Sequence, residues 1–226
     1  MISVPRLYPI VDAAFFSTTE DVAAFAQELI AGGCTLVQYR NKSGNARVML
    51  EQARELRRRC RTEPAPSAGS GQVLSLPKGV SDPHGLRLIM NDRADLCLLA
   101  QFDGVHVGQD DLSSESVRKI IGHERWLGVS THNPEQLAEA DRTSVDYVAI
   151  GPVFSTSSKD RPDPVVGLEG VLQTRLLTRK PLVAIGGITR ANAASVIEAG
   201  ADSVAVISDL LREPRKSAEE FFRILR

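Results

Sequence analysis

The feature that most constrains the fold is a regular alternation of short apolar runs with segments of helical periodicity, repeated eight times along the chain. The runs are rich in β-branched and aliphatic residues and have the length of single buried strands. They lie at residues 7–11, 35–39, 86–90, 104–107, 126–129, 145–150, 181–185 and 203–206. Between them, apolar residues recur three and four positions apart, a spacing typical of amphipathic helices, as at Val22, Phe25, Ala26 and Leu29.

Eight consecutive strand–helix units predict an all-parallel sheet covered by helices. Closing that sheet into a (β/α)₈ barrel leaves no strand edge exposed, and 226 residues lie near the lower end of the range for this fold. An open doubly wound sheet is the alternative. It would place the glycine fingerprint GxGxxG after the first strand, where residues 12–15 read DAAF. The sequence therefore favours a single α/β barrel domain over residues 1–226.

One segment, residues 62–85 (TEPAPSAGSGQVLSLPKGVSDPHG), interrupts this rhythm. It is rich in proline, glycine and serine and is long for a connection inside a compact domain. Because it follows a predicted helix, we expect it on the face remote from the carboxyl ends of the strands. The strand–helix rhythm resumes unchanged after it, so we interpret it as an insertion and not as a linker between domains.

Composition excludes several classes of protein. The 27 basic and 28 acidic residues balance, which argues against non-specific nucleic-acid binding. No apolar run reaches the roughly 18–20 residues that cross a bilayer. The three cysteines are scattered, so we expect neither a disulfide framework nor a zinc site, and we expect a cytoplasmic protein. A homo-oligomer is compatible with these data.

Local signals mark the ends of several predicted helices. Start signals occur at residues 17–20, at residues 133–135 and at Thr189. Glycines occur where helices are expected to stop, at residues 32–33 and at Gly200.

Polar residues gather directly after the strands, where a barrel carries its chemistry. Gly187, in the pair that follows the seventh strand, and Ser208 after the eighth are suited to a phosphate, because glycine lets the backbone N–H groups at a helix start approach an anion. The alternative is a pair of turn glycines that serve only a positive φ. Residues 156–159 (TSSK) offer hydroxyls and an ammonium group for a second phosphate contact, or they are a solvated serine-rich loop.

Two cations and two acids follow strands two to four. Arg40 and Lys42 leave the second strand on one side, and a buried pair of cations needs an anionic partner. Asp92 and Asp111 follow the third and fourth strands, so a Mg²⁺ ion between them and a diphosphate would account for the cluster, with Asn91 nearby. The alternative is that each aspartate caps the helix that follows it.

Other polar residues give weaker signals. His132 fits a general base, a phosphate donor or a residue packed at the rim, and we assign it no role. His106 within a strand, Cys97 on an apolar helix face and Trp126 at a strand start are expected to pack in the core. We assign no dedicated acid or base. The residues alone thus indicate a barrel transferase that holds two phosphorylated groups, one of them a Mg²⁺-bound diphosphate as leaving group.

Seven motifs, in order and spanning essentially the whole chain, resemble the thiamine phosphate synthase family: QYRNK (38–42), NDRADL (91–96), GVHVGQDDL (104–112), GVSTH (128–132), GPVFSTSSK (151–159), AIGGIT (184–189) and GADSVAVIS (200–208). The resemblance implies a Mg²⁺-dependent (β/α)₈ barrel. It also implies coupling of 4-amino-2-methyl-5-(diphosphooxymethyl)pyrimidine with a thiazole phosphate or carboxythiazole phosphate, by dissociative loss of diphosphate and capture of the pyrimidine-methyl cation by the thiazole nitrogen.

The resemblance also implies roles for individual residues. The pyrimidine diphosphate would be bound by Gln38, Arg40, Lys42, Asn91, Ser130 and Lys159. The metal ligands would be Asp92 and Asp111. The thiazole phosphate would be bound by Thr156, Ser158, Gly187, Ile207 and Ser208.

Two departures and two alternatives accompany this resemblance. The family loop Thr-x-Thr-Lys reads TSSK here, in which Ser158 keeps the hydroxyl, and the insertion at 62–85 has no counterpart. A sister family of thiazole tautomerases shares the phosphate motifs but typically lacks the paired aspartates, which this chain retains. A non-catalytic barrel that binds a phosphorylated metabolite is the other alternative, and it would show no Mg²⁺-dependent turnover.

Overall fold

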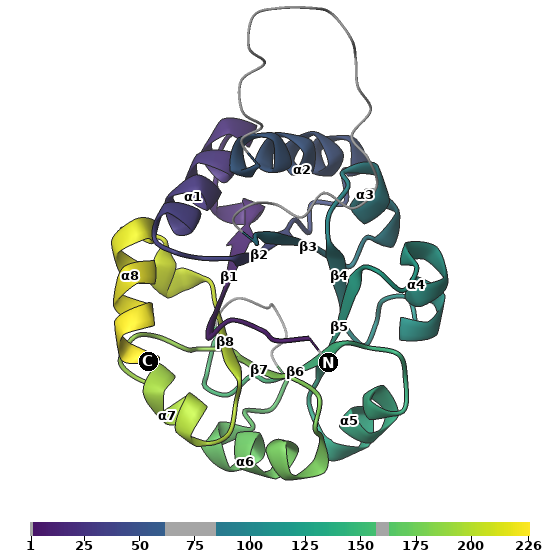
Figure 1. The fold of residues 1–226 in the computed structure, drawn as a ribbon, viewed down its shortest axis with the longest axis vertical. Coiled ribbons are helices and arrows are strands. Elements are labelled where there is room, and N and C mark those ends of the chain that lie inside the picture. The colour runs from purple at the N-terminus through teal and green to yellow at the C-terminus, as the bar shows by residue number, and fades with distance from the viewer. Residues whose placement is uncertain (1, 62–84, 157–162) are drawn as a thin grey trace, which may run out of the picture.

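The computed structural model describes residues 2–61, 85–156 and 163–226. Its strands form one closed parallel barrel in sequence order, which confirms the predicted fold (Figure 1). The strands are β1 (Leu7–Asp12), β2 (Leu36–Arg40), β3 (Arg87–Asn91), β4 (Gly104–Val107), β5 (Trp126–Thr131), β6 (Tyr147–Ile150), β7 (Leu182–Ile185) and β8 (Ser203–Val206).

Helices surround the barrel as a ring, each packed outside the strands (Figure 1). They are α1 (Thr19–Ala31), α2 (Ala46–Cys60), α3 (Ala94–Leu99), α4 (Ser114–Ile121), α5 (Pro134–Asp141), α6 (Gly167–Leu177), α7 (Ala193–Glu198) and α8 (Pro214–Ile224). Two short 3₁₀ helices, η1 (Ala13–Phe15) and η2 (Ser208–Leu210), follow β1 and β8. None of the helices in the described ranges is long and apolar enough to cross a membrane.

The strands are apolar on both faces because the barrel has two cores. The larger core fills the space between strands and helices. The smaller core lies within the barrel and is built from alternate strand residues, among them Tyr8, Leu36, Ile89, Tyr147 and Val183. Since successive strand residues point to opposite faces, both cores need apolar side chains from the same strand. This is why the strands read as continuous apolar runs.

Most of the expected helix signals are confirmed, with one correction. The side chains of Thr18 and Asn133 cap α1 and α5, and Gly32 ends α1. Gly200 has a φ of +109° directly beyond the end of α7. Thr189, however, does not start α7, which begins at Ala193. Residues 189–192 form a turn instead, in which the Asn192 side chain accepts a hydrogen bond from the Thr189 N–H at 2.8 Å.

Two expectations about packing, for Cys97 and Trp126, can be compared with the structure here. All three cysteines are free, with Cys34 and Cys97 buried. Trp126 is only half-buried at the start of β5, and the Arg87 guanidinium lies 4.8 Å from the centre of its ring. The interior position expected for Trp126 is therefore corrected to the edge of the inner core.

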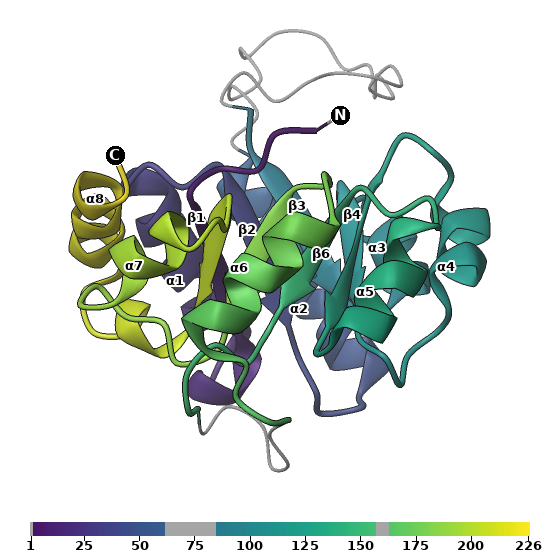
Figure 2. The same cartoon turned by 90° about the horizontal axis from the view of Figure 1, so that it is seen from below.

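The predicted insertion lies outside the described residues between 62 and 84, so its placement stays a prediction. The flanking described residues, Arg61 and Gly85, follow α2 and precede β3. Figure 2 shows both chain ends toward one end of the barrel. The loops that follow the strands lie at the opposite end, where the candidate site residues gather.

Candidate active site

The ends of β2, β3 and β4 bring the predicted diphosphate and metal residues together. These strands are neighbours in the closed barrel, with Asn91 in register with His106. The Lys42 ammonium forms an ion pair with the Asp92 carboxylate, and Asp92 is hydrogen-bonded to Asp111. Asp111 in turn accepts a hydrogen bond from the Gly108 N–H at 2.8 Å. One cation and two acids therefore meet at the carboxyl ends of three adjacent strands.

The two aspartates repel each other's negative charge. Burial, together with the hydrogen bond and charge of Asp111, raises the pKa of the Asp92 carboxyl to about 6, against the opposing effect of Lys42. A second positive charge would relieve this cost. The backbone at Asp92 has a φ of +62°, which L-amino acids rarely adopt and which is often found at functional sites.

The structure contradicts the alternative in which these aspartates are helix caps. The residue before α3 is Arg93, and no side chain caps that helix. Helix α4 is capped by Ser113, whose hydroxyl accepts a hydrogen bond from the Ser116 N–H at 3.3 Å. Asp92 and Asp111 therefore serve neither helix as a cap.

The residues at this point fit a hard cation such as Mg²⁺. Carboxylate oxygens suit that ion, and the buried Asn91 amide nitrogen, which has no hydrogen-bond partner in the described part of the chain, is a donor suited to an anion bound beside it. Among residues 2–61, 85–156 and 163–226, no cluster of three or more acidic, histidine or cysteine side chains encloses a metal. An ion held here by two carboxylates would take its other ligands from water and a bound phosphate.

Arg40 and Lys42 differ in their surroundings, which corrects the expectation that both lie in a buried mouth. The Arg40 side chain is 19% exposed and pairs with Asp12, which is 4% exposed at the end of β1. The Lys42 side chain is 52% exposed. Sequence reasoning missed Asp12, although a buried acid directly after the first strand is a signal that a cation lies nearby.

A second group missed by sequence reasoning is a hydrogen-bonded network inside the barrel. The Gln38 amide nitrogen lies 2.9 Å from the Tyr8 hydroxyl, and the Tyr8 and Tyr147 hydroxyls lie 2.9 Å apart. The His106 Nδ1 atom lies 3.0 Å from the Tyr147 hydroxyl, and its Nε2 atom lies 2.9 Å from Ser130 Oγ. The network thus joins Gln38 to Ser130, two of the residues expected to bind the pyrimidine diphosphate.

His106 is buried, as expected for a packing residue, but it is also hydrogen-bonded through both ring nitrogens. Its ring stacks on Tyr147 with centroids 5.5 Å apart. Burial lowers the pKa of His106 to about 4, and burial raises the pKa of Tyr8 and Tyr147. All three side chains are therefore neutral near pH 7.

Gly128 makes room for this network. It lies in register with Tyr147 on the neighbouring strand. A Cβ atom at Gly128 would lie 2.1 Å from Tyr147 Cζ and 2.5 Å from the Tyr147 hydroxyl oxygen. Because Gly128 has no side chain, the Tyr147 ring can lie directly against β5 at this position.

The loop after β6 is fastened to the end of β7, next to the glycine pair. The Val153 N–H donates to the Ile185 carbonyl at 2.9 Å, and the Phe154 N–H donates to the Gly186 carbonyl at 3.0 Å. Gly187 has a φ of +63°, and a Cβ atom there would lie 2.5 Å from the Ser155 carbonyl oxygen. These contacts bring the β6 loop, which continues to Thr156, against Gly187.

Gly187 therefore has the positive φ that the turn-glycine alternative requires. It also lies so close to the β6 loop that a side chain would not fit there. The Gly187 carbonyl accepts a hydrogen bond from the Asn192 side chain at 3.1 Å, which fixes this peptide. The helix start expected directly after β7 is wrong, since α7 begins only at Ala193. Ile207 and Ser208 stand at the end of β8, where Ser208 begins η2.

Ser158 and Lys159 lie outside the described residues, as does Ser157. Their expected roles in phosphate binding stay predictions. Thr156, the first residue of that loop motif, is described and half-buried.

An ion-pair cluster ties together the loops after β7 and β8. The Arg190 guanidinium donates to both carboxylate oxygens of Asp209, at 3.0 and 3.1 Å, and it also pairs with Glu220 on α8. Asp209 is therefore engaged with Arg190. Its charge is neutralised next to the region expected to hold a phosphate.

His132 occupies the rim between β5 and β6. Its Nδ1 atom contacts the Gly151 carbonyl, and its Nε2 atom lies 3.5 Å from an Asp163 carboxylate oxygen. These contacts join two loops, so the geometry supports the rim-packing interpretation of His132.

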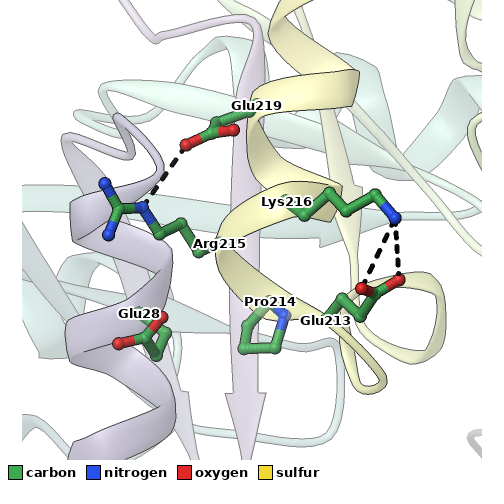
Figure 3. A pocket seen from close by; sticks show the side chains of 6 residues that line it. All are labelled: Glu28, Glu213, Pro214, Arg215, Lys216 and Glu219. Atoms are coloured by element: carbon green, nitrogen blue, oxygen red, sulfur yellow. Dashed lines mark hydrogen bonds and ion pairs between the residues drawn. The ribbon is translucent and has the colours of Figure 1, made fainter.

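A surface hollow of about 500 Å³ lies apart from this site, between α1 and α8 (Figure 3). Its charged lining residues pair with one another, Arg215 with Glu219 and Lys216 with Glu213. The hollow lies on the outer surface of the helices, whereas the candidate residues lie at strand ends. We therefore assign it no part in the chemistry.

Comparison with known proteins places this geometry in a family. The model described as "Thiamine monophosphate synthase" matches residues 7–67 and 76–210. The chain is 55% identical to the thiamine-phosphate synthase of Koribacter versatilis over 227 aligned positions, which cover 99% of this chain and 97% of that protein. The chain belongs to the thiamine monophosphate synthase family. This confirms the resemblance seen in the seven motifs.

Two further relatives agree with membership in the thiamine monophosphate synthase family. The thiamine-phosphate synthase of Chloroflexus aurantiacus is 40% identical, covering 90% of this chain and 83% of that protein. A solved thiamine phosphate pyrophosphorylase from Pyrococcus furiosus superposes with a TM-score of 0.78 at 30% identity, covering 97% of this chain and 95% of that one. The expected class of activity, a transferase of thiamine biosynthesis with small-molecule substrates, is confirmed. The family model leaves out residues 68–75, within the predicted insertion.

Proposed function

We propose that the chain couples 4-amino-2-methyl-5-(diphosphooxymethyl)pyrimidine with a thiazole phosphate to give thiamine phosphate and diphosphate. The observation that carries this proposal is the meeting of Lys42, Asp92 and Asp111 at the ends of adjacent strands, beside Arg40. A binding protein for a metabolite has no need to gather two repelling acids. An enzyme that releases diphosphate does, because that leaving group departs only when its charge is neutralised.

In this proposal the diphosphate lies over the ends of β2 and β3. Arg40 and Lys42 bind its oxygens, and the Asn91 amide, which has no partner in the described part of the chain, donates to it. Asp92 and Asp111 hold Mg²⁺, which supplies positive charge to the departing diphosphate oxygens. The Lys42–Asp92 ion pair keeps the ammonium close to where that charge develops.

The reacting carbon is the methylene group that joins the pyrimidine to the diphosphate. Its C–O bond breaks with both electrons leaving on the diphosphate, and the thiazole nitrogen then donates its lone pair to the resulting pyrimidine-methyl cation. Gln38 and Ser130 bind the pyrimidine and hold it in place for this transfer. The transfer needs no general base, in keeping with the neutral, hydrogen-bonded state of His106.

The second substrate places its phosphate between the loops after β6, β7 and β8. Thr156, Gly187, Ile207 and Ser208 bind it, with Ser158 completing the group and Lys159 reaching the diphosphate. The fastening of the β6 loop to β7 supports this placement, because it sets Ser155, which directly precedes Thr156, against Gly187. We place the reaction in the cytoplasm, with small phosphorylated substrates and no nucleic-acid or membrane partner, in a monomer or a homo-oligomer.

A direct assay tests the proposal. The purified protein is incubated with both substrates and MgCl₂, and thiamine phosphate and diphosphate are measured together. We expect the two products in equal amounts, and none when either substrate is left out or the metal is chelated. Thiazole isomerisation without diphosphate release would instead support the tautomerase alternative, and ligand binding without turnover would support the non-catalytic barrel.

A further inference from the structure

The network inside the barrel has a direction that follows from the orientation of the Gln38 amide, whose nitrogen faces Tyr8. The Gln38 amide nitrogen donates to the Tyr8 oxygen at 2.9 Å. Tyr8 has one hydroxyl proton, and its other hydrogen-bond partner is the Tyr147 oxygen at 2.9 Å. Tyr8 therefore donates to Tyr147.

The direction continues through the histidine. Tyr147 has accepted from Tyr8, so its own proton goes to His106 Nδ1 at 3.0 Å. That nitrogen must then be unprotonated, and the ring proton resides on Nε2. Nε2 donates to Ser130 Oγ at 2.9 Å. The buried chain thus fixes one tautomer of His106.

With the Gln38 amide nitrogen facing Tyr8, the other tautomer of His106 leaves a buried hydrogen without an acceptor, and only turning the amide over would reverse every bond in the network. A proton on Nδ1 would make Tyr147 an acceptor from His106 and a donor to Tyr8. Tyr8 would then accept two hydrogen bonds and have no acceptor for its own proton among the described residues. Because Tyr8 is 1% exposed, water does not satisfy it, and an unpaired buried donor is costly.

Only the two ends of the network remain open. In the described ranges the Gln38 Oε1 atom makes no hydrogen bond, and Ser130 Oγ has His106 as its partner. Gln38 therefore has an acceptor left over, and Ser130, already accepting from His106, has its hydroxyl proton left to donate. The two ends offer opposite polarities.

We propose that Tyr8, Tyr147 and His106 are positioning residues that make Gln38 a hydrogen-bond acceptor and Ser130 a donor toward the pyrimidine, and so select an amino-pyrimidine over an oxo-pyrimidine. This rests on the proposed function. An aminopyrimidine edge presents an N–H donor beside an unprotonated ring nitrogen, which matches these two ends. A pyrimidinone presents the reverse order, a carbonyl acceptor beside a ring N–H.

The first test needs no substrate. Full-length protein labelled with ¹⁵N at histidine is examined by NMR at pH 7, with the His106 signals assigned by their loss in His106→Asn. We expect Nε2 to carry the proton and Nδ1 to show the shift of an unprotonated nitrogen. A proton on Nδ1, or on both nitrogens, overturns the proposed polarity whether or not the protein makes thiamine phosphate.

The second test measures selectivity. Tyr147→Phe removes one hydroxyl and interrupts the hydrogen-bonded network at its centre. Tyr8→Phe is a second variant that interrupts the same network. We expect the KM for the aminopyrimidine diphosphate to rise about tenfold, as expected when one buried hydrogen bond is lost, with kcat changed less than about twofold. We also expect the preference for this substrate over its 4-oxo analogue to fall about tenfold.

Tyr39→Phe is the matched control. It removes a buried hydroxyl that donates to Gln52 at 2.6 Å and takes no part in the network. An equal effect on the control, or an unchanged amino-over-oxo preference in both Tyr147→Phe and Tyr8→Phe, overturns the proposal. If the wild type neither turns over nor binds the pyrimidine diphosphate in calorimetry, the proposed function and the ligand assignment fail together, while the ring tautomer still decides the direction of the chain.

Discussion

Asp12 and Arg40 lie in register on the first two strands and form an ion pair at the mouth of the barrel. The carboxylate is almost fully buried and also accepts a hydrogen bond from the Ala14 N–H at 3.1 Å. The other cation of this cluster, Lys42, pairs with Asp92 but is about half exposed. Removing Arg40 would therefore leave a buried carboxylate without its partner, whereas removing Lys42 would break an ion pair that is partly exposed to solvent.

Arg40→Met is expected to destabilise the protein, whereas Lys42→Met is expected to do so only slightly. Loss of Arg40 leaves Asp12 buried without its partner, which costs about 3–5 kcal/mol of unfolding free energy. An exposed pair such as that of Lys42 contributes about 0–1 kcal/mol. Urea denaturation measures both, and Asp12→Asn combined with Arg40→Met should recover much of the loss. Equal destabilisation by the two single variants would contradict this difference.

Asp92→Ala and Asp111→Ala are each expected to lower kcat by about 10²–10³-fold, because each removes a ligand for the charge that neutralises the leaving diphosphate. Steady-state assays over a range of MgCl₂ concentrations measure the loss, with circular dichroism confirming the fold. The exposed neighbours offer controls, Asp95→Ala on α3 and Asp110→Ala beside Asp111. Near-normal turnover of either site variant would remove its assignment as a metal ligand.

Gly187→Val is expected to raise the KM for the thiazole phosphate by about tenfold or more. A side chain at Gly187 meets the Ser155 carbonyl and Phe154, and so displaces the loop that carries Thr156. The KM for the pyrimidine diphosphate should change less. Gly122→Val is the matched control, since Gly122 has a φ of +75° but no atom within 4 Å of a Cβ placed there. Similar effects of both variants would mean that backbone strain alone is responsible.

Gly128→Ala is expected to destabilise the barrel by about 1–3 kcal/mol, because the added methyl group overlaps the Tyr147 ring. Thermal unfolding measures the loss. In a Tyr147→Val background the same substitution should cost much less, since the overlapping ring is gone. Additive losses in the double variant would show that the cost of the methyl group has another origin.

In metal-free Asp92→Asn protein, stability is expected to fall as the pH drops from about 6.5 to about 4; the substitution removes the Asp92 carboxyl, whose raised pKa of about 6 acts in the opposite sense in this window. Burial lowers the pKa of His106 to about 4, so in this window the unfolded chain binds a proton that the folded chain does not. The difference amounts to roughly 3 kcal/mol at its full extent. Urea denaturation in EDTA at a series of pH values measures it. His106→Asn should flatten this slope, whereas His123→Asn at an exposed position should not.

The fold was predictable because the strands of a parallel barrel are buried on both faces. Apolar runs therefore mark each strand without regard to its partners. The meeting of Asp92 with Asp111 followed from the same argument, since neighbouring strands in a closed barrel end side by side. Strand β6 begins at Tyr147, whereas the apolar run begins at residue 145. The first two residues of the run come before the part that pairs with the neighbouring strands.

Contacts between distant strands were not predictable in the same way. Tyr8 and Tyr147 are 139 positions apart, and only the closed register brings their hydroxyls together across the interior. The Asp12–Arg40 pair likewise depends on register, which a single strand does not reveal. Thr189 and Asn192 are both residue types that start helices, and the turn between them decides in favour of the later one. These misses share one cause. The local sequence permits more than one partner or helix start, and the tertiary structure decides which of them occurs.

The Arg190 cluster has a practical consequence for handling the protein. Arg190 follows β7, Asp209 follows β8, and Glu220 lies on the last helix, so one guanidinium clamps the C-terminal helix to the proposed thiazole phosphate site. Deleting α8, or fusing a bulky tag that displaces this helix, would break the Arg190–Glu220 ion pair and disturb the loops at the catalytic end of the barrel. Purification tags are therefore better carried at the N-terminus.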